Sequence, residues 1–391
     1  MSPIDRIKTF HAELTATRQD IHAHPELGFT EHRTADVVAK QLEALGIEVH
    51  RGVGGTGVVG VLREGNGPVS IGLRADMDAL PILEATELPY KSTRPGVMHA
   101  CGHDGHTTML LGAARYLAET RNFNGTVNFI FQPAEEGLGG AQAMLKDELF
   151  QRFPCDTVFG MHNHPGLPVG QFAIRPGIMM AAGAFFDIHV EGRGSHGARP
   201  EVSIDPVLVA SHIVTALQAI VARNVSPLDT AVVSATAIHG GDAYNVIPQT
   251  AEIRGTVRTF KNETMTLVEE NMKRTATGVA AAFGATASVD FRRLFAPLVN
   301  DPAETAEFAD VAAEIVGEQN VDRERSLIMA SEDFSFMLEK RPGAYINIGN
   351  GDTVGSVPVH NPGYNFNDEI LPLGAAALAG IVEKKLPRFV G

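Results

Sequence analysis

The order of helical and strand patterns constrains this 391-residue chain more than any other feature. In the first part, the patterns predict a helix at 31–46, strands at 57–62 and 69–75, a helix at 104–120, and strands at 126–133 and 156–162. Strands that alternate with helices in this way indicate a sheet flanked by helices. In such sheets, ligands bind at the carboxyl ends of the strands, so we expect functional residues in the segments that follow each strand.

The pattern changes between residues 183 and 294. It predicts a strand at 185–192, a helix at 205–224, strands at 230–238 and 250–260, a helix at 262–284, and a strand at 285–294. This β-α-β-β-α-β order is typical of a ferredoxin-like unit. Because the first pattern resumes at 295 and runs to a helix at 371–386, we predict an α/β protein of two domains. A discontinuous domain with a mixed sheet flanked by helices spans 1–182 and 295–391, and an inserted ferredoxin-like α+β domain spans 183–294.

Charge and cysteine content limit the classes of partner. The chain has 32 basic and 46 acidic residues, a net charge of −14, which disfavours nucleic acid and anionic lipid. Two cysteines do not make a disulfide framework. The N-terminal stretch MSPIDRIKTFHAEL lacks the apolar region of a signal peptide, and we expect no later run to approach the roughly 20 apolar residues of a membrane span. We therefore expect a cytoplasmic protein without nucleic-acid or membrane partners.

The stretch MHACGHDGH, residues 98–106, has a high density of reactive side chains. Cys101 and His103 stand two apart, so in extended backbone both point the same way and can converge on one ion. A thiolate and an imidazole suit zinc and the metals that resemble it. An alternative interpretation has Asp104 as the N-cap of the helix and His106 in its first turn, without further roles.

Adjacent carboxylates follow the strand at 126–133. Glu135 and Glu136, in FQPAEEG, are costly to place near a core without a cation. One carboxylate could bind a metal while the other acts as general base for a metal-bound water. Taken alone, such a pair is also typical of a solvated loop.

Three further groups come after strands or in loops. His162 and His164 lie in GMHNHP, and His360 lies in a loop rich in proline and glycine. A lone loop histidine usually has no special role. Asp76 and Asp78 end an apolar strand, where they could orient ligand imidazoles from behind. They could equally cap the strand end or pair with the nearby Arg74.

The motifs in their order resemble a known family. RADMDALP, MHACGHDGHT, FQPAEEG, GMHNHP, GRGSHGARP, NVIP, GTVRTF, ASEDFSF and VHNPGYNFND succeed one another along nearly the whole chain. Together they resemble the dinuclear metallo-amidohydrolases that include hippurate hydrolase, bacterial aminoacylases and plant auxin-conjugate hydrolases. Members have an α/β catalytic domain and an inserted ferredoxin-like domain, which serves as a lid and in several relatives forms the dimer interface. The resemblance therefore also implies a homodimer.

The resemblance implies specific roles for ten residues. The metal ligands would be Cys101, His103, Glu136, His162 and His360, with Cys101 as bridge between two divalent ions of zinc, manganese, cobalt or nickel. Glu135 would be the general base and Asp78 the orienting carboxylate. His196, Asn245 and Arg258 match positions that contact substrate, and His196 would serve the site of the neighbouring subunit. His164 stands where relatives often carry an aromatic residue, which leaves the acyl-side specificity open.

The implied activity is hydrolysis of the amide bond of a small N-acyl amino acid by a metal-activated water, with a planar arginine holding the carboxylate. Two other classes compete. Cys101 could be the nucleophile of a cysteine hydrolase, which chelation would not inhibit. The chain could also be a non-catalytic binding protein with a structural metal, but such sites are closed by four ligands and have no spare carboxylate like the Glu135–Glu136 pair.

Overall fold

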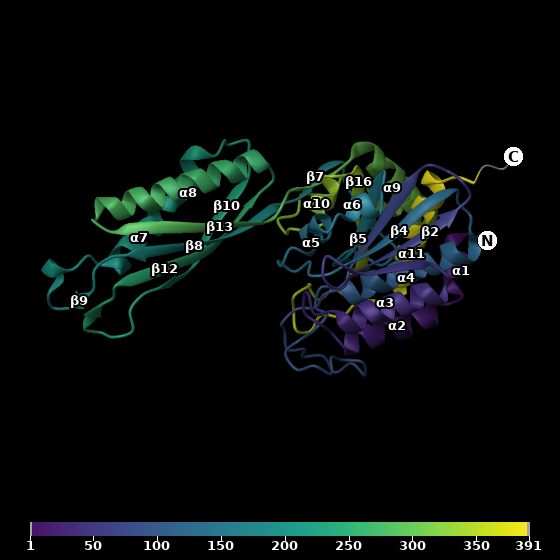
Figure 1. Cartoon of the computed structure of the whole chain (residues 1–391), viewed down its shortest axis with the longest axis horizontal. Helices are drawn as coiled ribbons and strands as arrows, with labels where there is room; N and C mark the ends of the chain where they lie inside the picture. The colour runs from purple at the N-terminus through teal and green to yellow at the C-terminus, as the bar shows by residue number, and fades with distance from the viewer. Residues whose placement is uncertain (1, 389–391) are drawn as a thin grey trace. The chain divides into compact units, whose positions relative to one another are not determined.

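The computed structural model of the chain describes residues 2–388, which form two compact units (Figure 1). The first unit comprises the chain up to Met179, Val299–Ser326, and the chain from Asp333 onward. The second comprises Met180–Leu298 and Leu327–Glu332. The predicted fold class, a mixed sheet flanked by helices with an inserted α+β unit, is confirmed. The short return of residues 327–332 to the second unit was not predicted from the sequence.

The first unit is built on an eight-stranded sheet of order β1-β2-β4-β3-β5-β16-β6-β15. Its strands are β1 (Glu48–Val53), β2 (Gly57–Glu64), β3 (Ser70–Asp76), β4 (Gly125–Gln132), β5 (Thr157–Pro165), β6 (Phe172–Ala173), β15 (Val321–Asp322) and β16 (Gly343–Gly351). The neighbours β4, β3, β5 and β16 are parallel, whereas β2 runs antiparallel to β4. The carboxyl ends of four central strands therefore meet at one edge of the sheet.

Helices flank this sheet because their apolar faces are removed from water when they pack against it. They are α1 (Pro3–Lys8), α2 (His11–Ala23), α3 (His32–Ala44), α4 (His103–Thr120), α5 (Gly140–Lys146), α6 (Leu149–Arg152), α9 (Pro302–Val316), α10 (Ser335–Leu338) and α11 (Leu371–Lys385). Helix α4 is buried over most of its length, since it carries small and apolar residues on every side and packs between β3, α2 and α11. Its first residue, His103, is thereby fixed at the carboxyl edge of the sheet.

The second unit has a four-stranded antiparallel sheet of order β10-β12-β8-β13. Its elements are β8 (Ala182–Glu191), β9 (Ser195–His196), α7 (Pro206–Ala219), β10 (Ala231–His239), β11 (Val246–Ile247), β12 (Thr250–Thr259), α8 (Asn262–Ala282) and β13 (Thr286–Phe295). Helices α7 and α8 cover one face (Figure 1), and β8 accordingly alternates between buried and exposed residues. The first and third strands of the β-α-β-β-α-β series are central, as in a ferredoxin-like unit.

One helical segment differs from expectation. Pro206–Asn224, which is α7 and the π-helical turn after it, is long and apolar enough to cross a membrane, with a mean hydropathy of 1.5. This contradicts the expectation that no run approaches the length of a membrane span. Length and composition do not separate a membrane span from a core helix, and Val209, Ile213 and Leu217 pack into the core of the second unit.

Candidate metal centre

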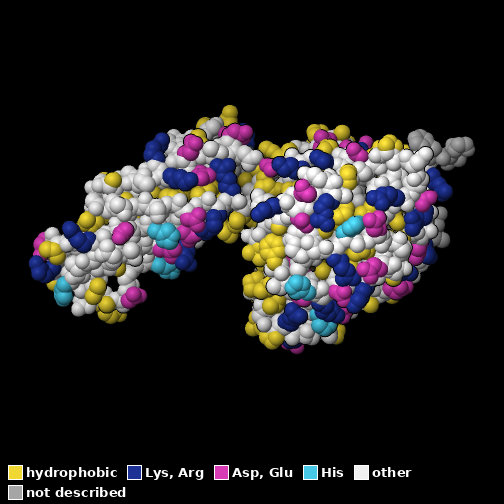
Figure 2. All heavy atoms as spheres, in the orientation of Figure 1, with side chains coloured by type: hydrophobic (Ala, Val, Ile, Leu, Met, Phe, Trp, Pro, Cys, Tyr) yellow, Lys and Arg dark blue, Asp and Glu magenta, His cyan; other side chains and the backbone are white. Residues whose placement is uncertain are grey.

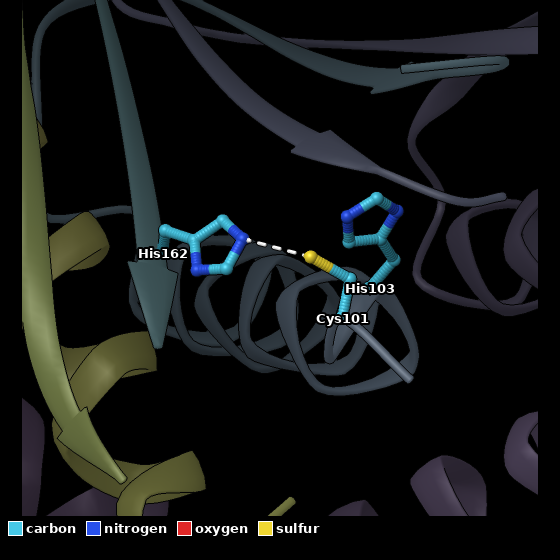
Figure 3. Close-up of side chains that lie close together, drawn as sticks. All are labelled: Cys101, His103 and His162. Carbon is cyan, nitrogen blue, oxygen red and sulfur yellow. Dashed lines mark hydrogen bonds between the residues drawn. The ribbon is translucent and has the colours of Figure 1, made fainter. Parts of the chain in front are cut away.

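The carboxyl edge of the central strands brings Cys101, His103 and His162 together (Figure 3). Cys101 precedes α4, His103 begins it, and His162 lies near the end of β5. The Sγ atom of Cys101 is 3.4 Å from Nε2 of His162. Nδ1 of His162 donates to the carbonyl oxygen of Asn163 at 2.6 Å, so the proton sits on Nδ1 and the lone pair of Nε2 faces the thiol.

The loop after β4 and the loop after β16 supply the next two groups. Oε1 of Glu136 is 3.2 Å from Nε2 of His360 and 4.0 Å from Nε2 of His103. The amide of His360 donates to the carbonyl oxygen of Ala100 at 2.7 Å, which fixes it beside Cys101. His360 has a φ of 63°, and Ala134 in the other loop a φ of 53°. Such left-handed backbone at non-glycine residues persists only where the surrounding structure imposes it, and it is frequent at functional sites.

The donor set fits divalent ions. Nε2 of His103 and Oε1 of Glu136 are buried and form no hydrogen bond with residues 2–388, although Oε1 of Glu136 has an ion-pair contact with His360. A bound cation would relieve this costly state. Possible ligand atoms lie within 4.8 Å of one another in the groups Cys101–His103–His162, Cys101–Glu136–His360 and His103–Glu135–Glu136. Sulfur, nitrogen and oxygen donors of this kind suit zinc and neighbouring metals. The structure thus brings all five predicted ligands together, with Cys101 common to two groups.

Burial and neighbouring charges set the protonation of these ligands. Burial raises the pKa of the Cys101 thiol well above its usual value, and Glu136 and Glu135 add to the shift. Burial opposes protonation of His103, but Asp76 and Asp78 outweigh it and raise its pKa to about 10. Burial and His106 hold the pKa of His162 well below its usual value. Cys101 is therefore a protonated thiol unless a cation is bound, which disfavours it as an independent nucleophile.

Asp78 has the geometry of an orienting carboxylate. Its Oδ1 is 3.2 Å from Nδ1 of His103, and its Oδ2 accepts the amide hydrogen of Glu136 at 3.0 Å. A single buried carboxylate thus fixes one imidazole and the backbone of the adjacent glutamate. Asp76 instead pairs with Nη1 of Arg74 at 2.8 Å, the alternative that the sequence had left open, and also with Nδ1 of His106 at 2.6 Å.

The interpretation of Asp104 as an N-cap is wrong. Gly102 occupies that position with a φ of 95°, and a Cβ there would lie 2.3 Å from Oδ1 of Asn163. Only glycine combines this backbone with so close an approach. Asp104 is fully buried and accepts from His22 at 2.8 Å.

His106 lies in the first turn of α4, and its side chain also forms buried hydrogen bonds. It is buried between Asp76 and Asn163, with its Nε2 2.7 Å from Oδ1 of Asn163. Asn163 in turn donates to the hydroxyl of Tyr364 at 2.7 Å, next to the predicted ligand His162. The sequence signal for this support was the second histidine of CGHDGH, which spacing alone did not distinguish from a helix start.

His164 is absent from the candidate ligand groups found among residues 2–388. Its Nε2 accepts a hydrogen bond from Nη2 of Arg325 at 3.0 Å. Burial and the nearby guanidinium lower the pKa of His164 to about 4, so the ring is neutral.

The predicted substrate residues His196, Asn245 and Arg258 all lie in the second unit. His196 and Asn245 are neighbours, because β9 pairs with β11 and the amide of Gly197 donates to the carbonyl oxygen of Asn245 at 2.7 Å. Arg258 lies at the other end of β12, eight residues from Thr250 and so about 27 Å along the strand. One chain therefore does not bring Arg258 to the other two.

Known proteins are similar to this chain along nearly its whole length. A family model described as peptidase family M20/M25/M40 matches residues 72–384. Hippurate hydrolase of Campylobacter jejuni is 46% identical over 387 residues, covering 99% of this chain and 100% of the relative. N-acetylcysteine deacetylase of Bacillus subtilis is 41% identical over 381 residues, covering 96% and 98%.

A solved structure extends the likeness to three dimensions. A Bacillus subtilis protein described as a dinuclear metal-binding peptidase of family M20 superposes with a TM-score of 0.82 at 37% identity, covering 97% of this chain and 99% of that one. The resemblance to amidohydrolases drawn from the motifs is thereby confirmed. From the family match, the full-length relatives and the shared fold, it follows that the chain belongs to peptidase family M20/M25/M40 and is an enzyme that hydrolyses amide bonds.

Proposed function

We propose that this enzyme hydrolyses the amide bond of N-acyl amino acids with the help of two divalent ions. The observation that carries the proposal is that five side chains able to bind metal lie close together, with a sixth group, Glu135, beside them. Two of the donor atoms, Nε2 of His103 and Oε1 of Glu136, are buried without a hydrogen-bond partner among residues 2–388. The names of the relatives hippurate hydrolase and N-acetylcysteine deacetylase point to substrates of this class. Ions bound at such a site acidify a water molecule and polarise the scissile carbonyl group.

Glu135 is the residue that moves the proton. It is 6% exposed, and its Oε1 accepts the amide hydrogen of Asp333 at 3.3 Å, which holds the carboxylate beside Glu136. We assign to it the transfer of a proton from the attacking water to the leaving amine. The new C–O bond then replaces the C–N bond, and the products are a carboxylic acid and an amino acid. Asp78 keeps His103 and Glu136 in place while this happens.

Arg258 suits the carboxylate of the amino acid. Its Nη1 donates to the hydroxyl of Thr256 and to the carbonyl oxygen of Val257, and within residues 2–388 it forms no ion pair. Burial lowers its pKa, so an anionic ligand would stabilise the charge. A planar guanidinium can pair with both oxygens of a carboxylate. We assign His196 and Asn245 to contacts made in a homodimer, because one chain separates them from Arg258.

Adjacent glutamates give a matched test with N-benzoylglycine. Glu135→Gln should retain about two ions per chain and bind substrate while turnover falls about 10²- to 10⁴-fold. Glu136→Gln should lose metal as well. Metal content by mass spectrometry and single-turnover hydrolysis measure both. Loss of metal in Glu135→Gln would make that residue a ligand and overturn the assignment.

Chelation separates the competing classes. Amide cleavage that chelation abolishes and added metal restores would support the two-ion enzyme and rank zinc, manganese, cobalt and nickel. Cleavage that survives complete metal removal would instead assign Cys101 as the nucleophile. One tightly held ion without cleavage of any N-acyl amino acid would favour a structural metal.

A further inference from the structure

Arg325, in the first unit, is a cation that forms no ion pair with a carboxylate of the described residues. It follows β15, and its backbone is fixed on both sides: its amide donates to the carbonyl oxygen of Ile174, and its own carbonyl accepts from Nη1 of Arg175 at 2.9 Å. Its Nε is buried and has no hydrogen-bond partner. Asp322 is near enough to act on it electrostatically, but no ion pair of Arg325 exists among residues 2–388.

Most arginines of this chain, which has a net charge of −14, pair with a carboxylate, although some within residues 2–388, among them Arg175 and Arg258, do not. Lys and Arg side chains are interspersed with Asp and Glu on the face drawn in Figure 2. Arg323, two residues away, pairs with Glu318 at 2.7 Å and with Asp310 at 2.9 Å. A half-buried guanidinium without an ion pair has lost part of its hydration, and a bound anion would offset that cost.

His164 complements the guanidinium. An arginine can only donate, so Nε2 of His164, 3.0 Å from Nη2 of Arg325, must be the acceptor. The ring proton therefore sits on Nδ1, and His164 presents a second N–H donor. This pair of residues combines one fixed positive charge with two kinds of donor, which is chemistry suited to a carboxylate.

The pair lies close to the metal ligands. His162 and His164 are two residues apart in β5, so their side chains project from the same face of the sheet, about 7 Å apart. The burial pattern agrees, since both are half-buried and Asn163 between them is buried. A group bound at Arg325 is thus one strand repeat from His162, within the span of a short dicarboxylic chain.

We propose that Arg325 and His164 form an anion subsite that receives a second carboxylate of the substrate, separate from the one assigned to Arg258. The proposal rests on the proposed function and deepens it, because it names N-acyl amino acids with two carboxylates as the preferred substrates. The second carboxylate belongs either to a dicarboxylic acyl group or to an acidic amino-acid side chain.

Paired substrates that differ only in one charge test this subsite. N-succinylglycine is compared with its amide, N-succinamoylglycine, and N-acetylglutamate with N-acetylglutamine. The wild-type enzyme should favour the charged member of one pair about 10-fold or more in kcat/KM, as expected for a hydrogen-bonded charge pair. The pair that responds identifies which half of the substrate reaches Arg325.

Variants assign the preference to its residue. Arg325→Gln should abolish the preference through KM, and Arg325→Lys should restore part of it. In both variants kcat/KM for N-benzoylglycine, which has no second carboxylate, should fall by a smaller factor than kcat/KM for the charged substrate. Arg323→Gln, which removes the same charge two residues away, should keep the preference. The proposal would be overturned if the wild-type enzyme had the same kcat/KM for both members of each pair. It would also be overturned if Arg325→Gln lowered kcat/KM for N-benzoylglycine as much as for the charged substrate.

Failure of the proposed hydrolytic function can be distinguished from failure of the proposed anion subsite. If none of these compounds is cleaved, the subsite can still be tested by measuring the binding of the same four compounds by calorimetry. A charged-over-neutral preference that disappears in Arg325→Gln supports the subsite, and its absence refutes it.

Discussion

A buried histidine makes the stability of the first unit depend on pH. His22 in α2 is fully buried, donates from Nδ1 to Oδ2 of Asp104 at 2.8 Å, and has its Nε2 3.4 Å from Oε1 of Glu84. The other charged or titratable groups that face it are Arg18, His99 with ring centres 6.3 Å apart, and Tyr90 edge-on at 5.7 Å. Burial opposes protonation, but the two carboxylates outweigh it.

The size of the effect follows from the pKa shift. The pKa of His22 rises from 6.5 to about 9, and at 1.36 kcal/mol per unit this corresponds to about 3 kcal/mol. Burial alone would raise the pKa of Asp104, yet the hydrogen bond from His22 lowers it, and both shifts describe one interaction that is counted once. Because the folded-state pKa is the higher one, this stabilisation is complete below about pH 6.5 and disappears as the pH rises through about 9.

The assay compares wild type with His22→Gln. Urea unfolding followed by circular dichroism at pH 6 and pH 10 should give a difference in unfolding free energy that is about 3 kcal/mol larger at pH 6. Groups common to both proteins cancel in this difference. His50→Gln, which removes a partly exposed histidine that pairs with Glu48 at 2.9 Å, is the control for loss of an imidazole whose ion pair contributes little to stability. A difference for His22→Gln that is constant with pH, or a ring pKa at or below 6.5 by NMR, would refute the reasoning.

Three further changes test the metal centre. Asp78→Asn should weaken metal binding about 10- to 100-fold in competition with a metal-indicator dye, since Asp78 orients both His103 and Glu136. Gly102→Ala should lower the unfolding free energy by about 2 kcal/mol or more in urea titrations, because φ is 95° and the new Cβ meets a buried amide oxygen. Iodoacetamide at pH 7.5 should leave Cys101 unmodified in the folded protein, as read by mass spectrometry, because its thiol is buried and its pKa is raised.

Each of these has a control in the chain. Asp36→Asn, at an exposed carboxylate paired with Lys40, should leave metal affinity unchanged. Gly96→Ala has a φ of 83° but open space around the new Cβ, so it isolates the backbone part of the cost. Cys155 is also buried and should become reactive together with Cys101 only in urea. Metal affinity that survives Asp78→Asn, an equal cost at both glycines, or rapid alkylation of native Cys101 would contradict the respective argument.

Sequence periodicity anticipated the elements whose apolar spacing is regular. The order of the inserted unit and the strands β3, β4 and β5 followed from it, and so did the position of Glu136 after β4. His162 and His164 were expected after the next strand but lie within β5, which is three residues longer at its end than its apolar pattern indicates. Helix α2 has weak amphipathic character, since it carries Arg18 and His22 on its buried side, and its role as a partner of Asp104 was not visible. Strand β16 is fully buried but contains three glycines in GAYINIGNG, a composition that disfavours strands.

Contacts between segments distant in the sequence could not be read from local patterns. The tie between His360 and Ala100 joins residues 260 positions apart, and the pair of His164 and Arg325 joins residues 161 positions apart. Spacing rules describe which side chains share a face of one element, not which loops meet. Asp104 was misjudged for the same reason, because its partners come from α2.

The position of β16 in the sheet also bears on the biosynthesis of the enzyme. β16 lies between β5 and β6, although the whole second unit separates it from them in sequence. During translation, β5 therefore emerges with one edge uncovered and waits for about 180 further residues before its neighbour is made. His360 is synthesised after β16, so its hydrogen bond to Ala100 can form only when the chain is nearly complete. The nascent protein would thus lack the last of the predicted metal ligands for most of its synthesis, and this ligand would be made shortly after the last strand of the sheet.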